Sequence, residues 1–173
     1  ITSDFDKTKH IYKDVKYFER SFGGVVPMDI IIDTKREGGV EKLSTLRRIE
    51  ELQDSLSLLP ELSRSISVVD FVKFAKQGVM FGNPDFYALP TRSEQQWLLT
   101  YLPRGTKDET GLASSMVTAD GRKARITVQM ADLSTPEMRE LTVRVEKMVS
   151  TIFPNAGFDV TITGASIKFI RSC

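Results

Sequence analysis

The chain contains one cysteine and one histidine among its 173 residues. Cys173 stands at the last position and has no second cysteine with which to form an internal disulfide. With His10 as the sole histidine, histidine-based catalytic triads and multi-histidine metal sites are nearly excluded. Neither a Gly-x-Gly-x-x-Gly motif nor a Walker loop occurs. These absences leave few routes to an enzyme.

The chain also lacks an excess of either charge. Its 24 lysines and arginines nearly balance 23 aspartates and glutamates, so no basic stripe or acidic tail predicts a nucleic-acid or polyanionic partner. The longest apolar run is a few residues, too short to cross a bilayer. The first 20 residues are strongly charged, unlike a secretory signal. The composition is that of an ordinary globular protein.

The two ends of the sequence favour a fragment of a longer protein. The chain begins Ile-Thr-Ser without an initiator methionine, and it stops in the middle of the pattern of residues 169–173. A processed mature protein is the alternative interpretation.

Residues 26–69 contain a strand–helix–strand pattern. An apolar strand-like run over 26–32 is followed by a loop with Gly38-Gly39 and a helical stretch over 40–58. Pro60 ends the helix, and a short β-branched run follows it. The inward face of the helix is predicted at Leu43, Leu46, Ile49 and residues 52–56, and the closing strand at Ile66, Val68 and Val69.

Residues 124–164 repeat this pattern. Alternating apolar residues over 126–130 predict a strand, and Ser134 with Glu137 forms a capping box that opens a helix. Pro154 follows the helix, and residues 160–162 make the closing strand. The expected inner face of the helix is Met138, Leu141, Val145, Met148 and Ile152. Two such units predict an α+β, ferredoxin-like split βαβ sandwich.

The whole chain, residues 1–173, is interpreted as a single domain with additions to this core. An amphipathic N-terminal helix is predicted within residues 1–24, and an Asp120-Gly121 turn adds a hairpin strand, which makes five strands. A helical insertion separates the repeats. The predicted parts are the N-terminal helix (1–24), the first βαβ unit (25–69), the insertion (70–110), the hairpin with the second βαβ unit (111–164), and a final segment (165–173).

The insertion is the most aromatic part of the chain and holds the candidate functional residues. Ser67 is predicted to cap a short helix with an inner face of Phe71, Phe74, Ala75 and Gly78. Ser93 is predicted to cap a second helix, which contains Trp97. The aromatic residues either seal the insertion onto the sheet or form an apolar cleft or docking surface. The candidate cargo or interdomain contacts are Phe71, Phe74, Met80, Phe81, Phe86 and Trp97.

Two carboxylates of the first strand form another candidate site. Asp29 and Asp33 share one face of a strand, which suits a cation or acid/base site as well as a solvated sheet face. The strand over 125–130 lacks the aromatic residues of RNA-binding ferredoxin-like domains, and no Cys-x-x-Cys motif is present to carry copper. No catalytic, metal or cofactor-binding residue is therefore predicted.

Several short motifs follow one another along the chain. They are residues 22–24 (Phe-Gly-Gly) before the strand 26–33, then 60–62 (Pro-Glu-Leu), 65–71, 117–126 and 160–164. Their order and spacing resemble those of the large extracytoplasmic loop of bacterial RND-superfamily exporters, of the MMPL-like and Patched-like kind. The resemblance covers almost the whole chain except the aromatic insertion.

The resemblance implies a porter domain on the periplasmic or extracytoplasmic side of the inner membrane. Such a domain shapes the path of hydrophobic or lipid-like cargo, with no cofactor and no catalysis of its own, while proton-relay carboxylates lie in transmembrane helices outside this chain. Its expected partners are the transmembrane helices and a second porter loop of the same transporter, and a homo-oligomer is possible. The alternative is a soluble ferredoxin-like ligand-binding or regulatory module.

Overall fold

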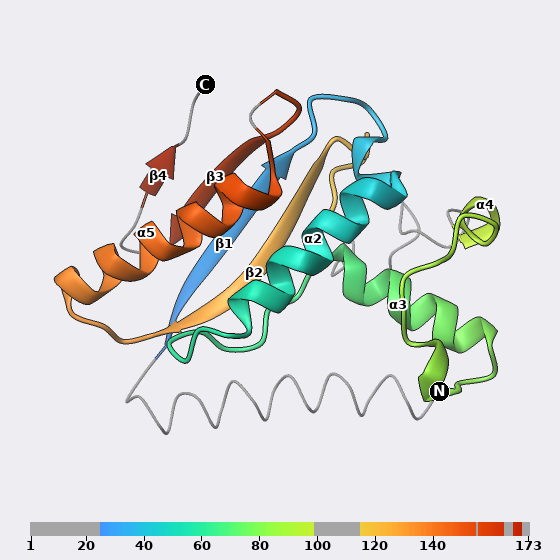
Figure 1. The fold of residues 1–173 in the computed structure, drawn as a ribbon, viewed down its shortest axis with the longest axis horizontal. Helices are drawn as coiled ribbons and strands as arrows, with labels where there is room; N and C mark the ends of the chain where they lie inside the picture. The colour runs from blue at the N-terminus through green and yellow to red at the C-terminus, as the bar shows by residue number, and fades with distance from the viewer. Residues whose placement is uncertain (1–24, 99–114, 155, 165–167, 171–173) are drawn as a thin grey trace.

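The computed structural model describes residues 25–98, 115–154, 156–164 and 168–170. Its centre is a four-stranded antiparallel sheet, and helices α2 and α5 lie side by side across one face of it (Figure 1). The described residues therefore form an α+β structure with one layer of helices on one sheet. In sheet order the strands are β2 (Lys123–Ala131), β1 (Val25–Asp33), β3 (Asp159–Gly164) and β4 (Lys168–Ile170).

The three longer strands bury alternate residues beneath the helices. Ile30 of β1 lies in register with Ile126 of β2 on one side and Ile162 of β3 on the other. All three side chains are buried. Burial of one such branched side chain contributes about 1.5–3 kcal/mol, so this row anchors the core. The predicted strands over 26–32, 126–130 and 160–162 are confirmed.

Helices α2 (Leu43–Leu56) and α5 (Thr135–Ile152) supply the other half of the core. A short 3-10 turn, η1 (Gly39–Glu41), precedes α2. The capping box at the start of α5 is confirmed, because Ser134 and Glu137 exchange hydrogen bonds between side chains and backbone amides. Most predicted inward residues are buried, whereas Met138 and Met148 lie at the edge and Val149 takes a central position.

The outer edge of β2 is covered by irregular backbone rather than by a strand. The amides of Ser63 and Ile66 donate to the carbonyls of Gln129 and Thr127 at 2.8 and 2.9 Å, and the Thr127 amide donates back to Ile66. Of the closing strand predicted at Ile66, Val68 and Val69, Ile66 does pair with β2, through an isolated bridge to Thr127, whereas its extension to Val68 and Val69 is wrong. Val68 and Val69 begin a helix instead, because the capping box of Ser67 and Asp70 starts helix geometry at this point.

The predicted hairpin is present at its turn and reduced in its first arm. The Gly121 amide donates to the Thr118 carbonyl at 2.9 Å, and Gly121 has the expected positive φ of 67°. Within the described residues 115–118, however, that arm makes a single bridge, between Val117 and Ala124. The additional strand lies elsewhere: β4 pairs with β3, in a segment predicted to lead out of the domain. The predicted N-terminal helix lies outside the described residues.

The insertion begins with helix α3 (Val68–Val79), followed by the 3-10 turn η2 (Pro84–Phe86) and the short helix α4 (Gln95–Leu98). The capping by Ser67 is confirmed, but the predicted inner face is wrong. Val68, Val69 and Val72 face the core, while Phe71, Phe74 and Ala75 are half-buried and Gly78 is exposed. The helix thus turns its aliphatic residues inward and leaves its aromatic residues at the margin.

Two glycine-bearing loops meet closely at one end of the sheet. The Gly38 amide donates to the Asp120 carbonyl at 2.8 Å, and Val40 donates to the carbonyl of Gly121 at 2.9 Å. Gly39 lies against Thr34, so that a Cβ on this glycine would stand 2.1 Å from the Thr34 Oγ1 atom. This approach requires glycine at position 39 and holds the loop after β1 against the turn before β2.

Candidate functional site

The structure places the six candidate contact residues along one segment, from α3 through η2 to α4. The side chains of Phe71, Phe74 and Met80 are half-buried, and Phe86 is 38% exposed. Trp97 lies in α4, and its side chain is outside the described part of the structure. The segment does not bring them together as a lined apolar cleft among the described pockets.

Phe81 is the most unusual of these residues. Its side chain is fully exposed, at 101% of the reference area, and its backbone φ is +58°. A non-glycine residue in this left-handed region carries a cost of about 1–2 kcal/mol. The backbone of Phe81 is strained, and its exposed ring adds no packing energy to the fold. The turn therefore presents Phe81 outward.

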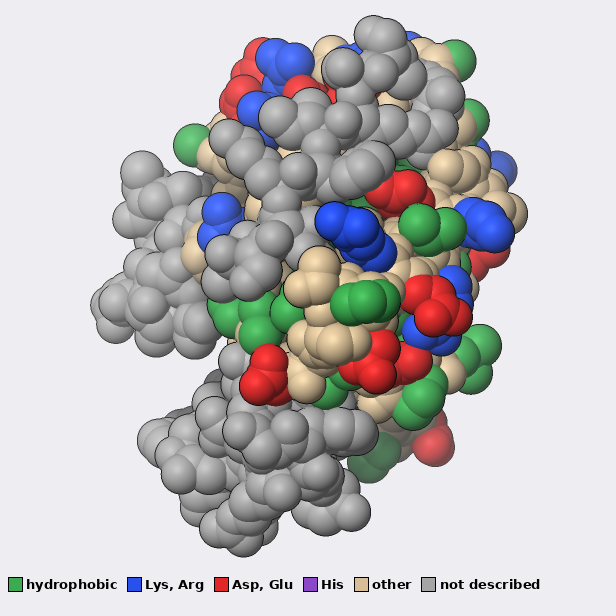
Figure 2. Space-filling view, turned by 90° about the vertical axis from the view of Figure 1, so that its left-hand side faces the viewer, with side chains coloured by type: hydrophobic (Ala, Val, Ile, Leu, Met, Phe, Trp, Pro, Cys, Tyr) green, Lys and Arg blue, Asp and Glu red, His purple; other side chains and the backbone are tan. Residues whose placement is uncertain are grey.

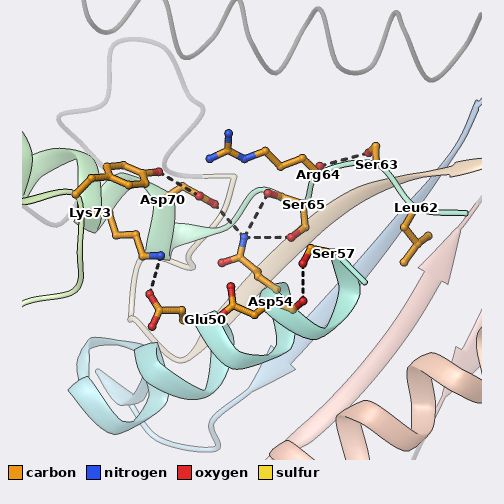
Figure 3. Close-up of a pocket in the computed structure, with 11 residues that line it drawn as sticks. Glu50, Asp54, Ser57, Leu62, Ser63, Arg64, Ser65, Asp70 and Lys73 are labelled. Atoms are coloured by element: carbon orange, nitrogen blue, oxygen red, sulfur yellow. Dashed lines mark hydrogen bonds and ion pairs between the residues drawn. The ribbon is translucent and has the colours of Figure 1, made fainter. Parts of the chain in front are cut away.

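The described residues form a polar cavity of about 320 Å³ between α2 and α3 (Figure 3). Helix α2 supplies one wall, the segment that covers β2 supplies the second, and α3 with Tyr87 supplies the third. Figure 3 shows that the lining side chains are mostly polar. They are Glu50, Gln53, Asp54, Ser57, Leu62, Ser63, Arg64, Ser65, Asp70, Lys73 and Tyr87.

A hydrogen-bond network through Gln53 and Asp70 joins the three walls. The Gln53 Nε2 atom donates to the Asp70 carboxylate at 3.0 Å and to the Ser65 hydroxyl at 3.2 Å. The Ser67 hydroxyl donates to the Gln53 Oε1 atom at 2.8 Å, and the Ser67 amide donates to Asp70 at 2.9 Å. Because Gln53, Ser67 and Asp70 each have at least two partners, the network fixes α3 relative to α2.

A second set of contacts closes the cavity at Tyr87. The Tyr87 hydroxyl donates to Asp70 at 3.4 Å, and the Lys73 Nζ atom pairs with Glu50 at 2.6 Å. Burial and the Asp70 carboxylate raise the pKa of Tyr87 to about 12, so the phenol stays protonated at neutral pH. The side chains around the cavity hold one another through these hydrogen bonds and the ion pair, so the arrangement is that of a rigid polar junction.

Asp29 and Asp33 do not combine into a site. Asp29 accepts a hydrogen bond from the Thr127 hydroxyl at 3.0 Å, whereas Asp33 pairs with Arg122 at 2.9 Å. Burial opposes the ionisation of Asp33, but hydrogen bonds from Arg122 and the Lys35 amide outweigh it and lower its pKa. Among the described residues, no group of three or more metal-ligating side chains converges. Each carboxylate therefore interacts with a different side chain, Asp29 with Thr127 and Asp33 with Arg122.

Charges of both signs are interspersed on the surface. In Figure 2, acidic and basic side chains of the described residues alternate with hydrophobic ones on the visible face. The formal net charge of +1 agrees with this mixture. Nothing on this face favours an extended polyanion as a partner.

Comparison with known families decides the assignment. The model of the MMPL family matches residues 4–170, which is nearly the whole chain. The chain belongs to the MMPL family. This confirms the resemblance read from residues 22–33, 60–71, 117–126 and 160–164. No curated protein and no solved structure matches the chain.

MMPL proteins are membrane transporters of the RND type, so the family assigns this chain to a transport protein. Within the described ranges, no helix has both the length and the apolar character to cross a bilayer.

The polar cavity between α2 and α3, with its network through Gln53 and Asp70, was not predicted from the sequence. Its one visible signal is the Ser67–Asp70 capping box, which was used to start a helix. The second role of Asp70, as acceptor for Gln53 and Tyr87, depends on residues 17 positions away on either side. Only the packing of α3 beside α2 brings these side chains together.

Proposed function

We propose that this MMPL chain is an extracytoplasmic porter domain of a proton-driven exporter of hydrophobic or amphiphilic cargo. The family match over residues 4–170 carries the proposal. The domain performs no catalysis and binds no cofactor, and it shapes the transport path together with the transmembrane helices and a second porter loop. Proton transfer takes place in those helices, outside this chain.

The strand pairing supports a ferredoxin-like identity for the core. Strand β1 lies between β2 and β3, and both pairings are antiparallel. Residues 61–66 follow α2 and add to the outer edge of β2, in the place of the second strand of a split βαβ sheet. The two strand–helix units thus interleave, as in a porter subdomain, with β4 added at the opposite edge.

The side of the membrane is tested by cysteine labelling in the parent exporter. We expect Glu51→Cys, on the exposed face of α2, to react with a membrane-impermeant maleimide in intact spheroplasts. The native thiol is removed first by Cys173→Ser, and a cytoplasmic protein reports lysis. Labelling that requires lysis would contradict an extracytoplasmic position and favour the alternative, a cytoplasmic ligand-binding module.

We further propose that the turn at Phe81 contacts cargo or a neighbouring domain of the transporter. Full exposure of the ring and a positive φ at the same residue support this proposal. Val79 and Phe86, each 38% exposed, flank it on the same segment. Phe71, Phe74, Met80 and Trp97 are the remaining members of the proposed contact segment.

Replacing Phe81 separates this role from folding. Asparagine tolerates the left-handed conformation, so Phe81→Asn should leave stability unchanged or raise it by up to about 1 kcal/mol. Export by the full-length transporter should fall at least about fivefold, since the loss of a buried aromatic contact costs about 1 kcal/mol or more. The measurement is export rate at matched expression.

Leu58 offers a matched control for this variant. It is 80% exposed, and it lies between α2 and Pro60, outside the contact segment. Leu58→Asn also removes an exposed apolar side chain, and we expect export to be unchanged. Equal export by the Phe81 and Leu58 variants would remove Phe81 from the set of contacts.

A further inference from the structure

A second cavity of about 230 Å³ lies at the start of α2. Arg36, Lys42 and Arg48 line it, together with Ser44, Thr45 and the ring of Phe158. None of the described residues that line it is a carboxylate. The chain as a whole is nearly neutral, so three cations around one hollow are a local departure from its composition.

These three cations have no acidic partner among the described residues. Two carboxylates of the adjoining strands are paired with other cations, Asp33 with Arg122 at 2.9 Å and Asp159 with Lys35 at 3.4 Å. Arg48 donates to the Ile152 carbonyl at 2.5 Å and lies 5.7 Å from the centre of the Phe158 ring. Those contacts hold the guanidinium in place at the C-terminal end of α5, and no carboxylate of the described residues pairs with it.

Backbone amides at this cavity also lack hydrogen-bond acceptors. The first amides of α2 have no preceding carbonyl inside the helix, and no side chain caps them. The N-cap residue is Lys42, and the first turn contains no acidic residue. The positive end of the helix dipole therefore faces a hollow that contains only cationic and neutral side chains.

Thr45 supplies an independent indication of a ligand. It is 3% exposed and lines the cavity, yet its hydroxyl has no hydrogen-bond partner in the described part of the chain. The hydroxyl oxygen is not among the fully enclosed polar atoms that lack a partner, so it opens onto the cavity. An acceptor in the cavity would satisfy it.

We propose that this cavity binds a phosphate group. Its oxygens would accept from the uncapped amides of α2 and the Thr45 hydroxyl, and from the guanidinium groups of Arg36 and Arg48. Lys42 adds a third positive charge. The phosphate belongs either to a soluble phosphate compound or to a lipid headgroup, and the same chemistry recognises both.

The test uses the 173-residue chain labelled with ¹⁵N and titrated with inorganic phosphate at constant ionic strength. We expect saturable shifts of the amides of residues 43–45. Arg36→Gln and Lys42→Gln should each weaken binding by about fivefold or more. Arg47→Gln, an exposed neighbour on α2 outside the cavity, should weaken it less than about twofold. Equal weakening by all three, or no shift up to about 50 mM phosphate, would overturn the site.

Thr45→Val separates ligand binding from packing. Removal of the unpartnered hydroxyl should raise the unfolding midpoint in phosphate-free buffer by about 2–4 °C. The same variant should weaken phosphate binding about threefold or more. A higher midpoint with unchanged affinity would show that the hydroxyl has no part in the site.

Vesicle flotation identifies the source of the phosphate. Capture by phosphatidylglycerol vesicles but not by phosphatidylcholine vesicles, with loss of capture in Arg36→Gln, assigns a lipid headgroup. Phosphate binding in the titration without capture by either vesicle assigns a soluble compound. Absence of both responses refutes the proposal, whatever the outcome of the labelling and export experiments on the porter role.

Discussion

The Gly39→Ala variant is expected to lose about 3 kcal/mol of unfolding free energy. A Cβ atom at position 39 would stand 2.1 Å from the Oγ1 atom of Thr34 and 2.5 Å from its Cβ atom. Thr34 is buried and stiff, and its hydroxyl donates to the carbonyls of Arg122 at 2.6 Å and Arg36 at 3.0 Å. Overpacking of this kind costs about 1–3 kcal/mol, and each lost hydrogen bond adds about 1 kcal/mol.

Equilibrium unfolding in urea measures the loss, and Gly78→Ala is the control. Gly78 lies on the exposed side of α3, with nothing within 4 Å of a Cβ placed there. Alanine in that helix should raise stability by about 0.5–1 kcal/mol. If Gly39→Ala were as stable as the unmodified chain, the close approach of the two loops would be refuted.

The second large loss is expected for Asp70→Ala, at about 3 kcal/mol. Asp70 accepts hydrogen bonds from the Ser67 amide, the Gln53 amide group and the Tyr87 hydroxyl. Removing it deletes half of a capping box, worth about 1 kcal/mol, and leaves a part-buried amide without its acceptor at a further cost of about 1–3 kcal/mol. Hydrogen exchange of α3 should accelerate more than that of α5.

Asp54→Ala is the matched control for this variant. Asp54 lines the same cavity, but it is exposed on α2, and its side chain makes no hydrogen bond with the described residues. Its replacement should change stability by less than about 0.5 kcal/mol. Equal losses for the two aspartates would show that charge in the cavity, rather than the network through Gln53, holds α3 in place.

The elements whose sequence signals agree with one another were predicted well. Helix α5 combines a capping box at Ser134, a three-four apolar spacing and Pro154 beyond its end, so every local preference favours one structure. Strand β1 was equally clear. The prediction failed at residues 68–69, where β-branched residues are typical of a strand, because the Ser67–Asp70 capping box outweighs that preference.

The two cavities could not be predicted, because their residues are far apart in the sequence. Arg36 and Arg48 line one hollow with Phe158, which belongs to the turn before β3. Single charged residues on loops and helices carry no signal of such a meeting. Even the aromatic insertion was interpreted only in outline: Phe71 and Phe74 were predicted to face inward, but the valines of α3 take the core positions.

Because α3 begins in the core, a rotation of the core would displace the far end of this helix. Val68 and Val69 are buried in the core at the beginning of the helix, while Phe81 follows its far end, which packs against the segment from η2 to α4. Twelve helical residues span about 18 Å, so a rotation of the core by about 10° would sweep the tip through about 3 Å. A small tilt of the sheet would therefore displace this tip by about the length of an atomic contact, at the fully exposed ring of Phe81.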